Sequence, residues 1–176
     1  MSLLTQEQQH VAALFTIKLE PMKTSTAEKT GKVSEIKIRY DPKLNIINMP
    51  IVNGSKDVAQ VVTPLFKNIL HHREAMYALY TNRANKVLGS FLVGLGGVAG
   101  VVADPKLVFQ AALKSNASGI ILAHNHPSGN RTPSQADIDL TKKVKEGARL
   151  LELTLLDHLI ILPDAEYFSF ADEGLL

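Results

Sequence analysis

The sequence contains no cysteine and no tryptophan among its 176 residues. The absence of cysteine excludes a disulfide scaffold, a thiol nucleophile and any zinc or iron–sulfur site built on thiolates. It is compatible with a reducing compartment, so we expect a cytoplasmic protein. An excess of charge is also missing, because 19 basic residues balance 17 acidic ones to a net charge of +2. Composition alone therefore does not indicate a nucleic-acid-binding protein, which needs clustered cations.

Long apolar runs are scarce as well. The run closest to a membrane span, residues 87–103, has no charged side chain but contains five glycines. We interpret it as two buried strands joined by a glycine turn and expect no membrane association. Residues 1–15 carry Gln, Glu and His where the apolar core of a secretory signal would lie, so no such signal is expected.

The chain is long enough for one ordinary domain, and its 45% hydrophobic and 20% charged residues are typical of a globular fold. We interpret residues 1–54 as a partly flexible N-terminal extension with a strand pair, at 33–40 and 44–52. In the first of these strands Ile36, Ile38 and Tyr40 share one face. Residues 55–176 are predicted to form the main domain.

Helical and extended patterns alternate along this domain, which predicts an α/β fold with a mixed sheet. In chain order the pattern predicts a helix capped by Ser55 and broken near Pro64, then a hairpin of strands at 74–80 and 86–93, and then a helix from Pro105. A buried strand at 119–123, a helix over 134–152 and a strand at 155–162 follow. The buried face of the helix over 134–152 is expected to consist of Ile138, Thr141, Val144, Ala148 and Leu151.

The residues with the clearest chemical meaning follow the buried strand. His124 and His126 alternate at its end, so their side chains point the same way and can bind one cation. Asp137 lies in the first turn of the next helix, and the Pro- and Gly-containing loop between them lets its carboxylate return to the two imidazoles. Two nitrogens and one oxygen leave a fourth position open, which is the pattern of catalytic zinc.

Simpler interpretations of the same residues remain open. A His-x-His pair near a strand end can face solvent or cap the strand without binding a metal. Ser134 and Asp137 form a Ser-x-x-Asp capping arrangement that also needs no metal. Capping and metal binding are compatible, because Asp137 has two carboxylate oxygens. Capping alone does not explain why the histidines, the turn and the capped acid occur together after a buried strand.

Residues from about 55 to 175 resemble the RadC family, within the JAB/MPN superfamily of zinc metallopeptidases. The superfamily pattern is a distant Glu, then His-x-His, seven residues, Ser, two residues and Asp. Here it is matched by His124, His126, Ser134 and Asp137, and the run Leu-Asp-His-Leu-Ile at 156–160 is also characteristic of RadC proteins. The resemblance implies a three-layer α/β/α sandwich with a mixed sheet, an architecture of the cytidine-deaminase-like kind.

The resemblance also implies a glutamate on an early strand, and Glu74 matches that position. Beside an activated water, such a carboxylate acts as the general base of a hydrolase. Without the resemblance, the favoured interpretation of Glu74 is an exposed residue that opens a strand next to Arg73. The chain departs from the family between residues 91 and 103, where a glycine-rich run replaces an acidic, Ser/Thr-containing strand; this departure bears on substrate preference.

The glycine-rich run imitates a dinucleotide-binding fingerprint. Residues 94–99 match G-x-G-x-x-A, but Asp104-Pro105 interrupts the helix that must follow, and no acid lies about twenty residues further on. We therefore interpret the match as a coincidence. A zinc deaminase is also disfavoured, because it needs H-x-E and a P-C-x-x-C segment and the chain has no cysteine.

The leading hypothesis is a zinc-dependent hydrolase that cleaves peptide or isopeptide bonds in a peptide or protein substrate. Zinc is bound by His124, His126 and Asp137, Glu74 activates the water, and Ser134 helps to hold the oxyanion. The alternatives are a DNA-repair-associated factor, as the RadC name suggests, and an interaction module with a metal site and no turnover. We expect nucleic-acid binding to be weak at most, because the only basic cluster is Lys142, Lys143, Lys145 and Arg149.

Overall fold

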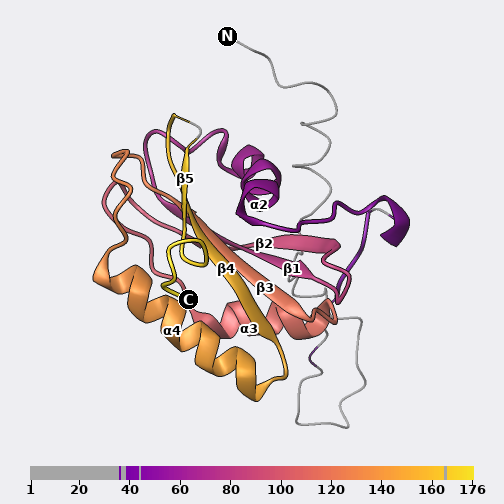
Figure 1. The fold of residues 1–176 in the computed structure, drawn as a ribbon. Coiled ribbons are helices and arrows are strands. Elements are labelled where there is room, and N and C mark those ends of the chain that lie inside the picture. The colour runs from indigo at the N-terminus through magenta and orange to yellow at the C-terminus, as the bar shows by residue number, and fades with distance from the viewer. Residues whose placement is uncertain (1–35, 37–38, 44, 165) are drawn as a thin grey trace, which may run out of the picture.

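The computed structural model describes residues 36, 39–43, 45–164 and 166–176. Its centre is a five-stranded sheet with the order β2-β1-β3-β4-β5 (Figure 1). The strands are β1 (Ala75–Thr81), β2 (Val87–Leu95), β3 (Gly119–Asn125), β4 (Thr154–Ile161) and β5 (Tyr167–Ser169). β3 and β4 are parallel and the other neighbours are antiparallel, so the predicted mixed sheet is confirmed.

Helices cover both faces of this sheet. α2 (Ser55–Val62) lies over one face, and α3 (Pro105–Lys114) and α4 (Gln135–Leu150) lie over the other (Figure 1). Alternate residues of each strand supply the two cores, as the pleat of a strand requires. In β1, Tyr80 packs with the α3 and α4 side and Leu79 with the α2 side. The three-layer α/β/α sandwich predicted from the sequence is confirmed.

The central strand β3 is buried at all seven of its residues, as its apolar run predicts. It pairs with β1 in a register that joins Met76 to His124. Continuing this antiparallel register by two residues brings Glu74, just before β1, beside His126, just after β3. The sheet thus places the predicted base and the two histidines at one end of adjacent strands.

Local sequence signals set the helix boundaries. Asp104 accepts the Lys106 N–H as the N-cap of α3, and Pro105 follows in the first turn, where a missing N–H costs nothing. α2 ends at Val62 and continues as the short 3-10 helix η2 (Thr63–Phe66), which contains Pro64. The predicted break near this proline is confirmed.

The predicted N-terminal strand pair is not found in the part of the chain that the structure describes. Residues 33–35 and 37–38 lie outside it, and Ile36, Arg39 and Tyr40 are not in a strand. The predicted strand at 44–52 is wrong: residues Ile46–Asn48 form the 3-10 helix η1, which Asn45 caps, and Ile51 makes a single bridge to Lys86. The amide cap of Asn45 offers the backbone a local turn in place of a ladder.

Other boundaries also differ from the prediction. Gly54, not Ser55, occupies the N-cap position of α2, and Ser55 donates its hydroxyl to the tail residue Asp172. Residues 87–103 contain one strand rather than two, because the chain leaves the sheet after Leu95. Leu151 is 39% exposed, since α4 ends at Leu150 and Glu152 turns the chain with φ 55°. The short strand β5 was not predicted.

Among the described residues, no helix is long and apolar enough to cross a bilayer. The uncharged run at 87–103 is accounted for by β2 and the irregular segment after it.

Candidate metal centre

The structure brings together the three side chains predicted as ligands. The Nε2 atoms of His124 and His126 lie 3.0 Å apart, and His124 Nε2 lies 3.3 Å from Asp137 Oδ1. One ligand atom from each residue falls within 4.8 Å of the other two. His124 is fully buried and Asp137 is partly exposed, so the group is open to solvent on the side of the carboxylate.

The end of β3 and the turn after it create this arrangement. His124 lies in β3, and the His126 N–H donates to the Ile161 carbonyl, which prolongs the pairing with β4 past the end of the strand. The Gly129 N–H then donates to the His126 carbonyl, and Gly129 has φ 74°. This left-handed conformation is accessible to glycine without strain. It reverses the chain so that α4 begins beside the two imidazoles.

Asp137 serves the helix and the candidate centre with different oxygens. Its Oδ2 accepts the Ser134 N–H at 2.7 Å and the Ser134 hydroxyl at 2.6 Å, and Ser134 Oγ accepts the Asp137 N–H, which completes a capping box. Its Oδ1 faces His124. Burial opposes ionisation of Asp137, but the hydrogen bond and charge of His124 in its protonated form, together with the bonds from Ser134, hold its pKa well below the usual range. The carboxylate is therefore in the charged form that binds cations.

The outer ring nitrogens of both histidines have partners. His126 Nδ1 lies 2.7 Å from the Asn130 carbonyl, which can only accept, so Nδ1 carries the proton and Nε2 keeps its lone pair. His124 Nδ1 lies 2.9 Å from Nε2 of His158, a fully buried residue of β4. Such outer partners are what orients histidines in metal sites.

The three residues fit a divalent metal ion. Two nitrogens that share a tetrahedral zinc with bonds of 2.0–2.1 Å lie about 3.3 Å apart, close to the 3.0 Å between the two Nε2 atoms. Imidazole nitrogens and a carboxylate oxygen are a common ligand set for such ions. The sequence-predicted trio could therefore hold a metal ion.

Glu74 lies one residue before β1, next to this group. Burial raises its pKa, and the nearby charges of His126 and then His124 partly offset that rise. Asp137 also raises the pKa of Glu74. These interactions place Glu74 within electrostatic range of all three candidate ligands.

The backbone on either side of Glu74 is held by the middle residue of the His-x-His motif. Asn125 is buried, accepts the Ala75 N–H at 2.9 Å and donates its amide to the Arg73 carbonyl at 2.9 Å. Glu74 itself pairs with the glycine-rich segment, since its N–H donates to Gly97 and its carbonyl accepts the Gly96 N–H. The candidate base is thus fixed from two directions.

The glycine-rich segment has a packing reason at Gly96. A Cβ there would collide with the Gly100 carbonyl and lie 2.7 Å from Val101 Cα. The chain can therefore fold back on itself here only because residue 96 is a glycine and has no side chain. No helix follows this segment before α3, so the match to a dinucleotide fingerprint lacks its helix.

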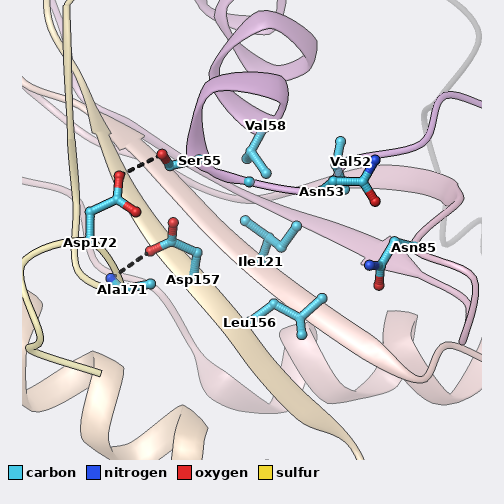
Figure 2. A pocket seen from close by; sticks show the side chains of 11 residues that line it. Val52, Asn53, Ser55, Val58, Asn85, Ile121, Leu156, Asp157, Ala171 and Asp172 are labelled. Atoms are coloured by element: carbon cyan, nitrogen blue, oxygen red, sulfur yellow. Dashed lines mark hydrogen bonds between the residues drawn. The ribbon is translucent and has the colours of Figure 1, made fainter.

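A separate hollow lies on the other face of the sheet, beside α2 (Figure 2). Its volume is about 210 Å³, and none of the candidate site residues lines it. Figure 2 shows the hydrogen bond from Ser55 to Asp172 beside Asp157, whose carboxylate accepts the Ala171 N–H. Asp157 thus faces away from the metal centre, while His158, the next residue, faces toward it.

Comparison with known proteins agrees with this arrangement. The family model described as a RadC-like JAB domain matches residues 52–175. The chain belongs to this family. The matched range of the RadC-like JAB domain contains the sheet, the two helical layers and the three residues of the candidate metal centre.

Several relatives of this RadC-like chain are UPF0758 proteins, a name that states no activity or ligand. The protein from Flavobacterium johnsoniae is 40% identical over 131 residues, which cover 74% of this chain and 56% of that protein. The protein from Porphyromonas gingivalis is 42% identical over 125 residues, covering 71% and 54%. The protein from Methanosarcina mazei is 36% identical over 123 residues, covering 70% and 52%. The chain thus spans about half the length of these relatives.

Two residues of the RadC-like site had no role in the sequence analysis. Asn125 was only the spacer between two histidines, and His158 was only part of a characteristic run. A buried asparagine in a strand must satisfy its amide, so its position at the end of a strand expected to be buried was a usable signal. No sequence signal links His158 to His124, 34 residues away.

Proposed function

We propose that this RadC-like domain is a zinc-dependent hydrolase that cleaves peptide or isopeptide bonds. The observation that carries the proposal is the convergence of two Nε2 atoms and one carboxylate oxygen beside Glu74. When bound, zinc supplies Lewis acidity that polarises a carbonyl group and makes water easier to deprotonate.

His124, His126 and Asp137 hold the ion in this proposal. Their three donors leave one position open, the feature that distinguishes catalytic from structural zinc sites. The partly exposed edge at Asp137 is where a substrate can approach.

Glu74 is the general base. Its carboxylate accepts a proton from the attacking water and then delivers that proton to the nitrogen of the leaving amine. A carboxyl with a raised pKa suits both transfers, because proton transfer is most effective when the pKa of the group approaches the working pH. The segment 73–75, held by Asn125, keeps this carboxylate in place.

Ser134 has a capping role in the structure and a proposed second role. Its hydroxyl donates to Asp137 Oδ2 at 2.6 Å, so its single proton is in use. To stabilise an oxyanion, as the sequence analysis expects, the hydroxyl must rotate away from Asp137 when substrate binds. Until that rotation, Ser134 orients Asp137.

The test separates metal binding from chemistry. We expect His124→Ala and Asp137→Ala to lose bound zinc, measured by elemental analysis of the purified chain. We expect Glu74→Gln to keep zinc and to lose hydrolysis in a screen of peptide and isopeptide-linked substrates. His71→Ala and Glu146→Gln change exposed residues outside the group and serve as matched controls.

Each negative result has a distinct meaning. Full zinc stoichiometry in the double variant His124→Ala, His126→Ala would refute the metal site. Unchanged hydrolysis in Glu74→Gln would leave the metal site standing and remove Glu74 as the base. Zinc binding without hydrolysis of any peptide in the wild type would favour the interaction module over the hydrolase.

A further inference from the structure

A chain of buried hydrogen bonds runs from α4 to the back of His124. Thr141 Oγ1 lies 2.6 Å from the Asp137 carbonyl and 2.7 Å from His158 Nδ1. His158 Nε2 then lies 2.9 Å from His124 Nδ1. Thr141 is 2% exposed, and both histidines are 0% exposed, so water does not compete for these bonds.

The position of one proton determines all the others in this chain. The Asp137 carbonyl can only accept, so the contact with Thr141 requires the hydroxyl hydrogen to point at it. Thr141 Oγ1 therefore accepts from His158, which places the proton of His158 on Nδ1. The lone pair on His158 Nε2 then accepts from His124 Nδ1–H. His124 is left with a free lone pair on Nε2, the atom that faces His126 and Asp137.

We propose that Thr141 is a positioning residue that acts through His158 to fix His124 in the tautomer with a free Nε2. The inference rests on the metal site of the proposed function. With the opposite direction of bonding, Thr141 would donate to His158, His158 would donate to His124, and the His124 proton would lie on Nε2. That arrangement would direct an N–H into the position of the metal.

His158 is suited to transmit the direction because each of its ring nitrogens contacts one partner, Thr141 Oγ1 at Nδ1 and His124 Nδ1 at Nε2. A neutral imidazole has one donor and one acceptor nitrogen, so fixing one nitrogen fixes the other. Phe170 stacks on the ring with centroids 4.7 Å apart and planes at 15°, which prevents the ring from turning over.

The sheet contains a specific feature that brings His158 to this face. β3 and β4 pair Ile120 with Leu155 but Ile121 with Asp157, so Leu156 is an extra residue in β4. A bulge of this kind exchanges the two faces of the strand beyond it. As a result His158 faces His124, and Asp157 faces the hollow beside α2.

The two candidate histidine ligands are oriented by different means. His126 donates to the backbone carbonyl of Asn130, which fixes its tautomer without help. His124 has another imidazole behind it, which could donate or accept. Only His124 therefore needs a third residue to decide the direction, and Thr141 is the residue in contact with that imidazole.

The first measurement needs no variant. Spectra of the metal-free wild-type chain labelled with ¹⁵N-histidine, recorded near pH 8 where neutral rings predominate, distinguish protonated from bare ring nitrogens. We expect the protons of both His124 and His158 on Nδ1. A proton on Nε2 of His158 overturns the proposal.

The second measurement compares two substitutions at Thr141. Thr141→Val keeps nearly the same shape and removes the hydroxyl, whereas Thr141→Ser removes a methyl group and keeps the hydroxyl. We expect Thr141→Val to weaken zinc affinity, with the about 10- to 100-fold loss of a direct outer partner as the upper limit, and Thr141→Ser to keep the wild-type affinity. We also expect Thr141→Val to put part of the His124 proton on Nε2 in the metal-free spectrum.

Urea unfolding of the metal-free variants shows whether the effect comes from loss of the fold. If Thr141→Val binds zinc as tightly as Thr141→Ser and has the same His124 tautomer, the proposal is wrong. If Thr141→Val does not fold, the wild-type tautomer measurement still decides the question. Loss of zinc in His124→Ala with unchanged affinity in Thr141→Val overturns the positioning role alone. Zinc retained in His124→Ala overturns the proposed metal site instead.

Discussion

Asn125 donates a 2.9 Å hydrogen bond from its side-chain amide to the backbone carbonyl of Arg73. The same amide group accepts the Ala75 N–H with its oxygen, so Asn125 holds the residues on both sides of Glu74. Asn125 also lies between the two candidate histidine ligands in sequence. One three-residue segment therefore directs two side chains to the candidate metal centre and a third to the backbone that carries the candidate base.

Asn125→Ala is expected to lower both stability and hydrolysis. The substitution leaves the buried Ala75 N–H without a partner, which costs about 1–3 kcal/mol in the free energy of unfolding. Urea unfolding measures this loss, and elemental analysis is expected to show that zinc is retained. Asn48→Ala, at an exposed position of η1, is the control and is expected to change little. Unchanged stability together with unchanged hydrolysis in Asn125→Ala would contradict a positioning role.

Gly96→Ala tests whether the glycine-rich segment supports Glu74. Its Cβ has no room beside the Gly100 carbonyl, whereas a Cβ at Gly97 meets nothing within 4 Å. We expect Gly96→Ala to cost about 1–3 kcal/mol, as overpacking usually does, and to reduce hydrolysis because Gly96 bonds to Glu74 and Arg73. Gly97→Ala is expected to stay within about 0.5 kcal/mol of the wild type. Equal effects of the two substitutions on stability would refute this view.

The grouping of the three candidate ligands could be predicted from the sequence because the position of each depends on local structure. Alternation along one strand puts His124 and His126 on the same side, and a capping box puts Asp137 at the start of α4. The loop between them is short, so few arrangements keep these residues apart. The same locality made the helix starts at Pro105 and Ser134 predictable.

His158 could not be placed in the same way. Its face depends on the extra residue at Leu156, and a shift of one residue exchanges the faces of a strand. Without that bulge, Asp157 would point at His124, and an alternating pattern at 155–162 gives no sign of which residue is extra. The N-terminal strand at 44–52 failed for a related reason, because a strand needs a partner and only Ile51 found one.

The pH dependence of stability is expected to show the ionisation of Asp157. Burial raises its pKa, although Ser169 and two backbone N–H groups donate to the carboxylate. A carboxyl whose pKa is higher in the folded state stabilises the fold below its unfolded pKa, and this contribution is lost as the pH rises through the folded pKa. The wild type should therefore lose stability relative to Asp157→Asn as the pH rises above about 4, the ordinary pKa of an aspartate.

Urea unfolding of both proteins at several pH values measures that relative change. The lost carboxylate acceptor in Asp157→Asn adds an offset that does not depend on pH, so only the slope of the difference matters. A difference that is constant, or that grows in favour of the wild type with rising pH, would contradict the raised pKa of Asp157.

Nucleic-acid binding is expected to be weak and sensitive to salt. Lys142, Lys145 and Arg149 are exposed and share one side of α4, whereas the chain as a whole carries a net charge of only +2. Three phosphate contacts give a log–log salt slope no steeper than about −3 on duplex DNA, and such contacts support only non-specific affinity. We therefore predict no duplex binding tighter than about 10⁻⁵ M at physiological salt.

Fluorescence anisotropy across a salt series measures both the dissociation constant and the salt slope, and a triple variant with glutamine at these three positions should flatten the slope. Submicromolar binding that resists salt would instead favour the DNA-repair-associated factor over the hydrolase, because it requires base or shape contacts that this helix face cannot supply.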